Sequence, residues 1–264
     1  MHIRLDTRRA IVTGSTAGIG LAIASGLAAA GAHVTITGRT QVRVDEAIAT
    51  IVRQMPDARL AGVAGDLGTR EGAQRLIAEV PETDILVNNL GIFEPKAFFD
   101  ITDEDWLRFF EVNVMSGVRL SRHYAQGMAR RGWGRIQFLS SESALQIPAE
   151  MVQYGTTKTA QLAVSRGLAE TLAGTGVTVN AVLPGPTRSE GVGGFFGKLA
   201  AERGMSQETV ERDFIATHRP TSLIKRLASV KEVANLCVYL ASEQASATTG
   251  AAMRVDGGVV RSIA

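Results

Sequence analysis

The chain has 264 residues, of which 45% are hydrophobic and 20% are charged, and its formal net charge is +2. This composition argues against disorder, and the small net charge argues against a nucleic-acid partner. No apolar run reaches the ~18 residues that cross a bilayer, and the N-terminus shows no signal-peptide core. The single cysteine, Cys237, excludes an intrachain disulfide. We therefore expect a cytoplasmic protein that does not bind a membrane.

Short apolar runs alternate with longer helical patterns along the chain. The predicted strands cover residues 10–12, 34–36, 60–63, 85–87, 136–139, 177–182 and 252–255. The predicted helices cover residues 19–30, 42–54, 70–79, 106–130, 154–172 and 230–240. Strands without polar alternation are typical of a parallel sheet that is buried on both faces. We therefore expect an α/β fold over residues 1–264: a single domain with one doubly wound, Rossmann-like parallel sheet and helices on both faces.

Residues from about 186 to 220 interrupt this alternation. Glycines recur over 191–197, and a short helical pattern follows over 206–217. An insertion after a strand is often an active-site lid, so we expect a substrate lid here. The alternative is a helical hairpin that covers the sheet. The apolar residues of the interval, which would favour a substrate with hydrophobic bulk, are Phe195, Phe196, Leu199 and Met205.

A glycine-rich segment, residues 13–20, follows the first predicted strand and opens the first predicted helix. Its glycines are spaced as Gly-x-x-x-Gly-x-Gly. Glycines let the chain turn sharply and bring backbone amides close to a pyrophosphate, and a helix N-terminus favours negative charge. The segment therefore predicts a dinucleotide site. A purely structural glycine turn is the alternative.

The end of the second predicted strand should meet the adenosine ribose of such a dinucleotide. An NAD site usually offers a carboxylate there, which binds the 2′-hydroxyl. This sequence has Gly38, Arg39 and Thr40 instead. Arg39 can pair with a 2′-phosphate, and Thr40 can donate a hydroxyl. We therefore predict NADP as the cofactor, with NAD possible; Arg39 as a plain surface cation is the alternative.

Tyr154 and Lys158 lie just over one helical turn apart, so their side chains project from the same face of a predicted helix. A nearby ammonium should lower the pKa of the tyrosine, which could then exchange a proton with a substrate oxygen. As an isolated pair they would more simply indicate a packed tyrosine. Ser140 and Ser141 end the fifth predicted strand, at the edge where a parallel sheet binds ligands. Adjacent strand residues point in opposite directions, so only one of the two serines can serve.

In this order, the motifs resemble those of the short-chain dehydrogenase/reductase family across nearly the whole chain. The residues that match the family's cofactor segments are Gly14, Ser15, Thr16, Gly18, Ile19, Gly20, Asp66, Leu67, Asn89, Gly91, Pro184, Gly185 and Thr187. The residues that match its catalytic Asn-Ser-Tyr-Lys set are Asn113, Ser141, Tyr154 and Lys158. Ser141 is preferred to Ser140 because it precedes Tyr154 by 154 − 141 = 13 residues, the family's usual interval. One departure is Leu90, which replaces a small alanine and adds bulk beside the pocket.

The resemblance implies a role for each member of this set. Tyr154 would act as general acid in reduction and as general base in oxidation, while Ser141 steadies the substrate oxygen. Lys158 would bind the nicotinamide ribose and lower the pKa of Tyr154, so that both residues also contact the cofactor. Asn113 would hold a water that links Lys158 to solvent.

We therefore expect an NADP(H)-dependent oxidoreductase that acts on a small carbonyl or secondary alcohol. An isomerase or dehydratase on the same fold and a non-catalytic dinucleotide-sensing protein are the alternatives. The four histidines are dispersed and show no metal-ligand spacing, so we expect no metal. The resemblance further implies a homodimer or homotetramer that packs through residues 106–130 and 154–172.

Overall fold

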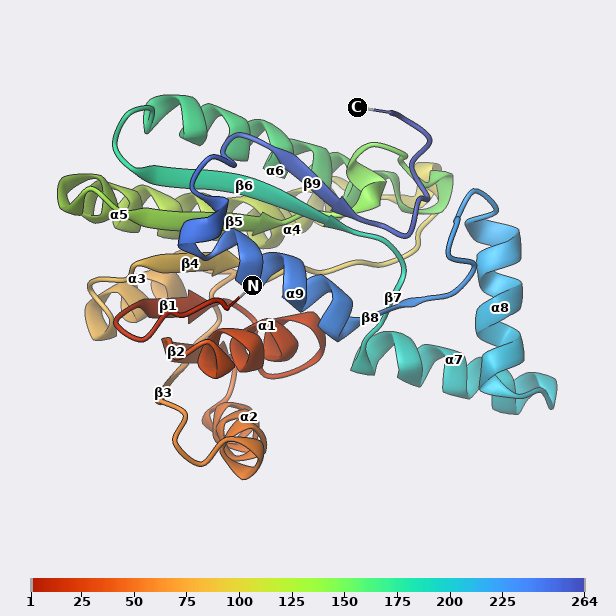
Figure 1. The fold of residues 1–264 in the computed structure, drawn as a ribbon. Coiled ribbons are helices and arrows are strands. Elements are labelled where there is room, and N and C mark those ends of the chain that lie inside the picture. Colours follow the sequence, from red (N-terminus) through yellow and green to blue (C-terminus); the bar gives the residue numbers. More distant parts are fainter. Residues whose placement is uncertain (1, 264) are drawn as a thin grey trace.

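The computed structural model describes residues 2–263, except for the side chains of Phe195 and Lys198. Within this range, seven strands form one parallel sheet in the order β3-β2-β1-β4-β5-β6-β9 (Figure 1). These strands are β1 (Arg9–Val12), β2 (His33–Gly38), β3 (Leu60–Ala64), β4 (Ile85–Asn88), β5 (Gly134–Leu139), β6 (Val177–Pro184) and β9 (Ala252–Val255). A separate short pair joins β7 (Thr187–Arg188) to β8 (Ala228–Ser229). The predicted doubly wound parallel sheet is confirmed.

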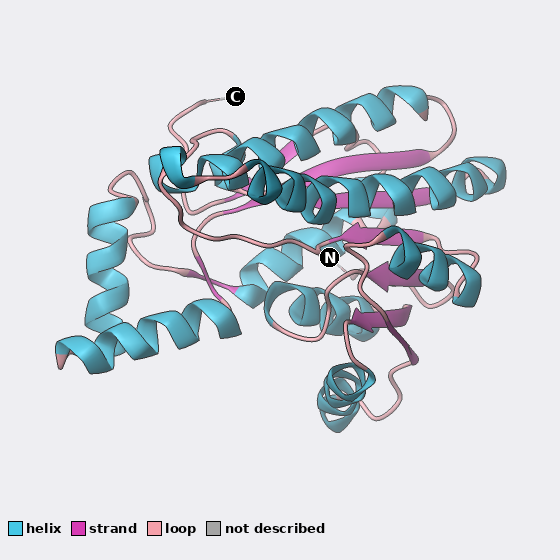
Figure 2. Ribbon diagram, turned by 180° about the vertical axis from the view of Figure 1, so that it is seen from behind, coloured by secondary structure: helices cyan, strands magenta, loops and turns pink. Residues whose placement is uncertain are grey.

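Helices cover both faces of the sheet (Figure 2). They are α1 (Gly18–Ala29), α2 (Gln41–Gln54), α3 (Arg70–Glu79), α4 (Asp103–Phe110), α5 (Ser116–Arg131), α6 (Val152–Thr171), α7 (Glu190–Arg203), α8 (Gln207–His218) and α9 (Val230–Leu240). The short 3₁₀ segments are η1 (Phe98–Asp100), η3 (Glu142–Ala144), η4 (Ala149–Met151) and η5 (Glu243–Ala245). Helices α3 and α9 have the predicted bounds.

The apolar strands separate two hydrophobic cores, as the absence of polar alternation predicts. In β1, Ala10 and Val12 join the core that is covered by α1, α2 and α9. Ile11 points the other way, into the core that is covered by α3 and α5 and flanked by α6. All three side chains are at most 1% exposed. Neighbouring strand residues therefore stabilise opposite faces of the sheet.

The helix predicted over 106–130 is wrong in its start and in its continuity. Helix α4 begins three residues earlier, because Thr102 and Asp105 form a capping box at its N-terminus. A π-helical segment, η2 (Glu111–Met115), then separates α4 from α5. Such a wide turn carries an extra residue and often marks a functional site. It is the segment that contains Asn113.

Helices α7 and α8 occupy the interval that interrupts the strand–helix alternation. They lie beyond the carboxyl ends of the strands and cover neither face of the sheet (Figure 1). Phe196 from α7 and Ile215 from α8 are buried in a small apolar cluster of their own. The glycine-rich residues 191–197 are helical and belong to α7, which Ser189 caps by accepting the N–H of Val192 at 3.4 Å.

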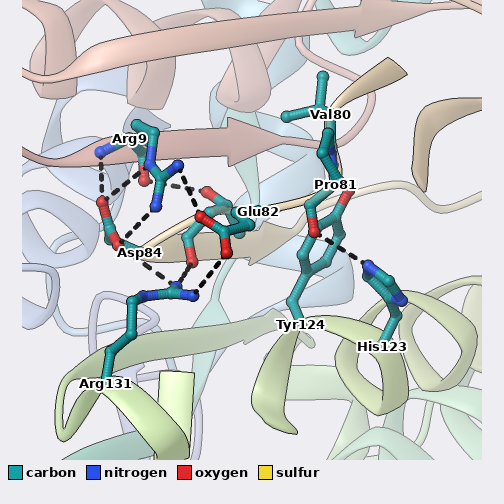
Figure 3. A network of polar contacts seen from close by, with 9 residues as sticks. Arg9, Val80, Pro81, Glu82, Asp84, His123, Tyr124 and Arg131 are labelled. Carbon is teal, nitrogen blue, oxygen red and sulfur yellow. Dashed lines mark hydrogen bonds and ion pairs between the residues drawn. The ribbon is translucent and has the colours of Figure 1, made fainter. Parts of the chain in front are cut away.

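Charged side chains form a network at the amino ends of the central strands β1 and β4 (Figure 3). Arg9 at the start of β1 donates its backbone N–H to Asp84 at 2.9 Å. Arg131 at the end of α5 lies 3.4 Å from the same carboxylate, and Glu82 accepts from Arg9 at 3.1 Å. This network joins the starts of β1 and β4 to the end of α5. It lies at the amino ends of these strands, whereas the polar residues described next lie at the carboxyl ends.

Candidate active site

Most of the polar residues singled out in the sequence lie where the strands of the sheet end. Strands β2 and β3 lie on one side of β1, and β4, β5, β6 and β9 lie on the other. The chain therefore reverses direction across the sheet between β1 and β4. In open α/β sheets, ligands bind in the crevice at such a switch point, outside the carboxyl ends of the strands.

The glycine segment after β1 is held in a tight turn against the end of β4. Gly14 and Gly18 have φ values of +62° and +56°, which favour glycine. A Cβ on Gly20 would lie 2.3 Å from the carbonyl oxygen of Gly14 and 2.6 Å from Nδ2 of Asn89. Nδ2 of Asn89 donates to the carbonyl oxygens of Thr13 at 2.9 Å and Gly14 at 3.1 Å. The Asn89 amide therefore braces the turn.

Ser15 lies beneath this turn and is fully buried. Its backbone N–H donates to the carbonyl oxygen of Thr37 at 2.9 Å. Its hydroxyl donates to the carbonyl oxygen of Val12 at 2.7 Å and accepts the N–H of Thr37 at 2.9 Å. Both groups are hydrogen-bonded inside the protein, so Ser15 holds the turn in shape. Ile19, in the first turn of α1, is half-buried.

The end of β2 lies against the same turn. A Cβ on Gly38 would lie 2.4 Å from Cγ2 of Thr16, so Gly38 and Thr16 are in close contact. The next residue, Arg39, is exposed, and no residue of the range 2–263 forms a hydrogen bond or ion pair with its side chain. Thr40 caps α2 by accepting the N–H of Arg43 at 3.5 Å. A free guanidinium beside the glycine turn is suited to bind a phosphate.

The two predicted adenine contacts differ in exposure. Asp66 is exposed after β3, and its Oδ1 accepts the N–H of Gly68 at 3.0 Å. Leu67 is buried and belongs to the core on the α3 and α5 side of the sheet. Asp66 is therefore the member of the pair that solvent or a ligand can reach.

The segment after β6 passes close to the C-terminal strand. Pro184 is the last residue of β6, and a Cβ on Gly185 would lie 2.5 Å from the carbonyl oxygen of Asp256. Thr187 is buried, and its hydroxyl donates to the carbonyl oxygen of Gly185 at 2.8 Å. Gly185 therefore allows the segment to turn against the chain after β9.

The two serines after β5 have different partners. The hydroxyl of Ser140 donates to the carbonyl oxygen of Lys158 at 2.8 Å. The hydroxyl of Ser141 donates to Oε2 of Glu142 at 2.6 Å and accepts the N–H of Ser143 at 3.1 Å. Ser141 also interacts with the phenol of Tyr154. Of the two serines, Ser141 is therefore the one that interacts with Tyr154.

Tyr154 and Lys158 lie one turn apart at the start of α6. The Lys158 Nζ atom lies 5.5 Å from the centroid of the Tyr154 ring. It donates to the carbonyl oxygen of Leu139 at 2.7 Å and to Oε1 of Gln161 at 3.3 Å. A Cβ on Gly91 would lie 3.4 Å from Nζ, so the segment after β4 also reaches this point.

Burial controls the protonation of both side chains. It raises the pKa of Tyr154 above its ordinary value, and it lowers the pKa of Lys158 to about 7. Ser141 and Arg219 oppose the rise in the pKa of Tyr154, whereas the carboxylate of Glu142 adds to it. The expectation that Lys158 lowers the pKa of Tyr154 is therefore wrong for these side chains by themselves. The reason is that burial also disfavours the charged ammonium that would stabilise the phenolate.

Asn113 lies in the π-helical segment and is buried with its amide fully bonded. Its Oδ1 accepts the N–H of Ile92 at 2.7 Å. Its Nδ2 donates to the carbonyl oxygen of Ile92 and to the hydroxyl of Thr157, both at 3.0 Å. Its own carbonyl oxygen accepts from Nε2 of Gln161. The structure thus brings Asn113 and Lys158 together through Gln161.

Several residues near Tyr154 were not anticipated from the sequence. Phe93 is 60% exposed, and its ring packs edge-to-face on that of Tyr154, 6.4 Å away between centroids. Ile147 is about half exposed and contacts the position of Gly155, where a Cβ would lie 2.7 Å from its Cγ2. Leu145, on the same loop, is also about half exposed. These residues lie outside regular elements, so no periodic pattern marked them.

The segment predicted as a substrate lid, residues 186–220, contains α7 and α8. The N-terminus of α7 lies close to the glycine turn, since a Cβ on Gly18 would lie 3.3 Å from Cβ of Ser189. Phe196, however, is 2% exposed inside the apolar cluster shared by α7 and α8, with Leu199 packed against it. Phe196 therefore packs within the α7–α8 segment and does not reach solvent. Met205 is exposed between the two helices, and the side chain of Phe195 lies outside the described part of the protein.

No helix within residues 2–263 has both the length and the apolar character needed to cross a membrane. No group of three or more histidine, cysteine, aspartate or glutamate side chains in this range is arranged to hold a metal ion.

The chain has many relatives among known proteins and solved structures. Residues 14–260 match the family model described as enoyl-(acyl carrier protein) reductase. The uncharacterized oxidoreductase YvaG of Bacillus subtilis is 49% identical over 263 residues, which cover 100% of both chains. L-sorbose reductase from Gluconobacter frateurii, solved in complex with NADPH and L-sorbose, is 32% identical with a TM-score of 0.92 over 100% of both chains.

A third relative is a 3-oxoacyl-(acyl-carrier-protein) reductase from Agrobacterium tumefaciens, solved with NADP bound. It is 29% identical with a TM-score of 0.85, over 97% of this chain and 95% of the other. The chain belongs to the short-chain dehydrogenase/reductase family. It is an oxidoreductase of that family.

Proposed function

We propose that the protein is an NADP(H)-dependent oxidoreductase that interconverts a ketone and a secondary alcohol, with Tyr154 as the general acid and base. The observation that carries this proposal is the convergence of Ser141, which follows β5, with Tyr154 and Lys158, which lie on α6, at the carboxyl end of β5. Each brings a group that proton transfer to a carbonyl oxygen requires: a hydroxyl donor, a phenol and an ammonium.

The residues at the β1 and β2 ends fit a dinucleotide that carries a 2′-phosphate. Gly20 leaves no room for a side chain, and Gly14 has a positive φ that favours glycine. A glycine turn of this kind before a helix lets a pyrophosphate approach the backbone closely. Arg39 is exposed next to this turn with its guanidinium free. The NADPH in the Gluconobacter reductase and the NADP in the Agrobacterium reductase support this choice of cofactor. When bound, the nicotinamide supplies or accepts the hydride.

The protein's own residues would manage the proton and the substrate oxygen. Tyr154 would donate its phenolic proton to the oxygen as the carbonyl is reduced, and remove it in the reverse reaction. Ser141 would hold the oxygen beside the phenol. Lys158 would bind the nicotinamide ribose and, once charged, stabilise the phenolate. Asn113 would support Lys158 from the π-helical segment.

The substrate class follows from the side chains next to Tyr154. Phe93, Leu145 and Ile147 place exposed apolar surface on the loops beside the phenol. We infer a ketone that carries an apolar group rather than a polyhydroxylated one. The L-sorbose bound to the Gluconobacter reductase is the contrary example among the relatives. L-Sorbose is therefore included in the test as the competitor.

The test is the oxidation of NADPH with a panel that holds an alkyl ketone, a 3-oxoacyl thioester and L-sorbose. We expect turnover, with the apolar members preferred, and we expect Tyr154→Phe to lose it by about a thousandfold or more. NADPH binding by this variant, followed by fluorescence, should stay within a few-fold of wild type. Retained turnover in Tyr154→Phe would exclude this role for Tyr154. A preference for L-sorbose would exclude the apolar substrate class alone.

We also infer a homo-oligomer, dimeric or tetrameric, in the cytoplasm. Phe99 is 96% exposed before α4, and Leu107 on α4 is 70% exposed. Large apolar side chains that stand fully in water are often covered by another copy of the chain. Light scattering should give a dimer or tetramer, and a stable monomer would contradict this assembly.

A further inference from the structure

A buried ion pair lies directly behind the serine of the site. Oε1 of Glu142 accepts from Nε of Arg219 at 3.0 Å, and the two side chains are only 6% and 10% exposed. Glu142 follows Ser141 after β5, whereas Arg219 is the residue that follows α8. The pair therefore connects the catalytic side of the sheet with the α7–α8 segment, across a large separation in sequence.

Glu142 also fixes the hydroxyl proton of Ser141. The hydroxyl donates to Oε2 of Glu142 at 2.6 Å and accepts the N–H of Ser143 at 3.1 Å. A hydroxyl has a single proton to donate, so without substrate the carboxylate holds this proton, and the hydroxyl turns from Glu142 to the substrate oxygen when it donates. These two contacts also fix the direction of the remaining lone pair of the Ser141 oxygen.

Arg219 balances the charge that Glu142 introduces. A carboxylate buried without a cation is strongly unfavourable, whereas a bonded pair is tolerated. Arg219 is itself held by the carbonyl oxygen of His218 at 2.8 Å, and Glu150 from η4 lies 3.7 Å from its Nη1. The exposed carboxylate of Glu150 is thus a weaker second partner.

The two charges of the pair act on Tyr154 in opposite directions. Glu142 raises the pKa of Tyr154, and Arg219 lowers it. The ammonium of Lys158, on the same helix as Tyr154, is the other ionisable group beside the ring. Together with Glu150 behind Arg219, these are the charged groups that the sheet, α6, η4 and the residue after α8 bring toward the phenol.

We propose that Glu142 and Arg219 form a positioning pair that orients the Ser141 hydroxyl and keeps the charge beside Tyr154 balanced. Neither needs to touch the substrate; both act through Ser141 and Tyr154. Because Arg219 directly follows α8, the pair also links the position of Ser141 to the C-terminal end of α8. The α7–α8 segment thereby contributes to the site through Arg219. This inference rests on the proposed function of Ser141 and Tyr154.

The test compares Glu142→Gln, Arg219→Met and the double variant in the oxidation of the alcohol that corresponds to the best ketone of the panel. As Tyr154 is the base in this direction, the rate rises with pH through its pKa. Glu142→Gln should move the acidic limb of kcat/KM to lower pH by about one unit, and Arg219→Met should move it to higher pH by a similar amount. The double variant should return close to the wild-type limb.

The value of kcat is a second readout for the same variants. Each single variant should lose about tenfold or more in kcat, because the Ser141 hydroxyl is no longer held by a balanced carboxylate. Arg219→Lys keeps the charge and should keep the wild-type limb, even if Arg219→Met does not fold. Arg226→Met, in the same loop but paired with exposed Glu232, is the matched control and should change neither quantity.

Opposite shifts would not arise from a general loss of packing. If both single variants lower the rate without moving the limb, or move it in the same direction, the positioning role is excluded. If Tyr154→Phe retains turnover, the proposed function fails instead, so the two failures are distinguishable. An unchanged kcat and limb in Glu142→Gln would by itself overturn the inference.

Discussion

The side-chain amide of Gln161 bridges Lys158 and Asn113. Its Oε1 accepts from the Lys158 ammonium at 3.3 Å, and its Nε2 donates to the main-chain carbonyl oxygen of Asn113. Gln161 is 2% exposed. The amide therefore links the lysine of the site to the π-helical segment by direct hydrogen bonds.

Gln161→Leu should therefore lower the catalytic activity without unfolding the protein. It removes the acceptor beside the ammonium and leaves the carbonyl of Asn113 without this donor. Since hydrogen bonds to charged groups contribute about 1.5–3 kcal/mol, we expect kcat/KM to fall by about tenfold or more. Steady-state kinetics would measure this. Gln244→Leu, the same change at an exposed glutamine, is the control. Equal kcat/KM in both variants would show that the bridge has no catalytic role.

The buried ammonium of Lys158 should make stability depend on pH. Burial lowers the pKa of Lys158 to about 7 from an ordinary value of 10.5. Between these values the unfolded chain binds the proton more tightly than the folded protein. The stability of the wild type should therefore rise as the pH rises through this window, by at most about 1.4 kcal/mol per pH unit. Below the window, the full cost of burying the charge is present.

Lys158→Met tests this dependence through urea unfolding at a pH below 7 and again well above it. The variant lacks the titrating group, so its stability relative to wild type should be most favourable at the lower pH and should decline as the pH rises. Loss of the hydrogen bond to Leu139 is a constant offset. Lys231→Met, at an exposed lysine, should show no such trend. A relative stability of Lys158→Met that is flat with pH would refute the shift.

The sequence was most informative where local rules decide the structure. Gly14 and Gly20 predicted the glycine turn because a tight turn after a strand needs glycine, and the interval from Ser141 to Tyr154 predicted which serine serves the site, a choice that stays a prediction. The bridge through Gln161 and the ion pair of Arg219 could not be predicted. Both depend on which distant segments meet, and hydrophobic periodicity carries no information on that. Helix α7 was not predicted because its glycines have low helix propensity. Packing in the tertiary structure outweighs this propensity.

Arg39→Leu should reduce the preference for NADPH without affecting NADH. The free guanidinium beside the glycine turn would lose its pairing with the 2′-phosphate, a charge-assisted contact. We expect KM for NADPH to rise by about tenfold or more, while KM for NADH stays within about twofold. Arg53→Leu, at the exposed end of α2, is the control for a lost surface charge. A parallel rise for both cofactors would show that Arg39 does not discriminate between them.

Gly20→Ala should abolish dinucleotide binding, because the added Cβ would lie 2.3 Å from the carbonyl oxygen of Gly14 and 2.6 Å from Nδ2 of Asn89. Neither atom can retreat without opening the turn, since Nδ2 itself holds the Gly14 carbonyl at 3.1 Å. Gly167→Ala is the matched control: Gly167 is an exposed position of α6 with no atom within 4 Å of its Cβ position. Alanine there should stabilise the protein by about 0.5–1 kcal/mol through helix propensity. NADPH fluorescence titration and thermal unfolding would separate the two effects. NADPH binding of Gly20→Ala at wild-type affinity would mean that the turn does not set the approach of the phosphates.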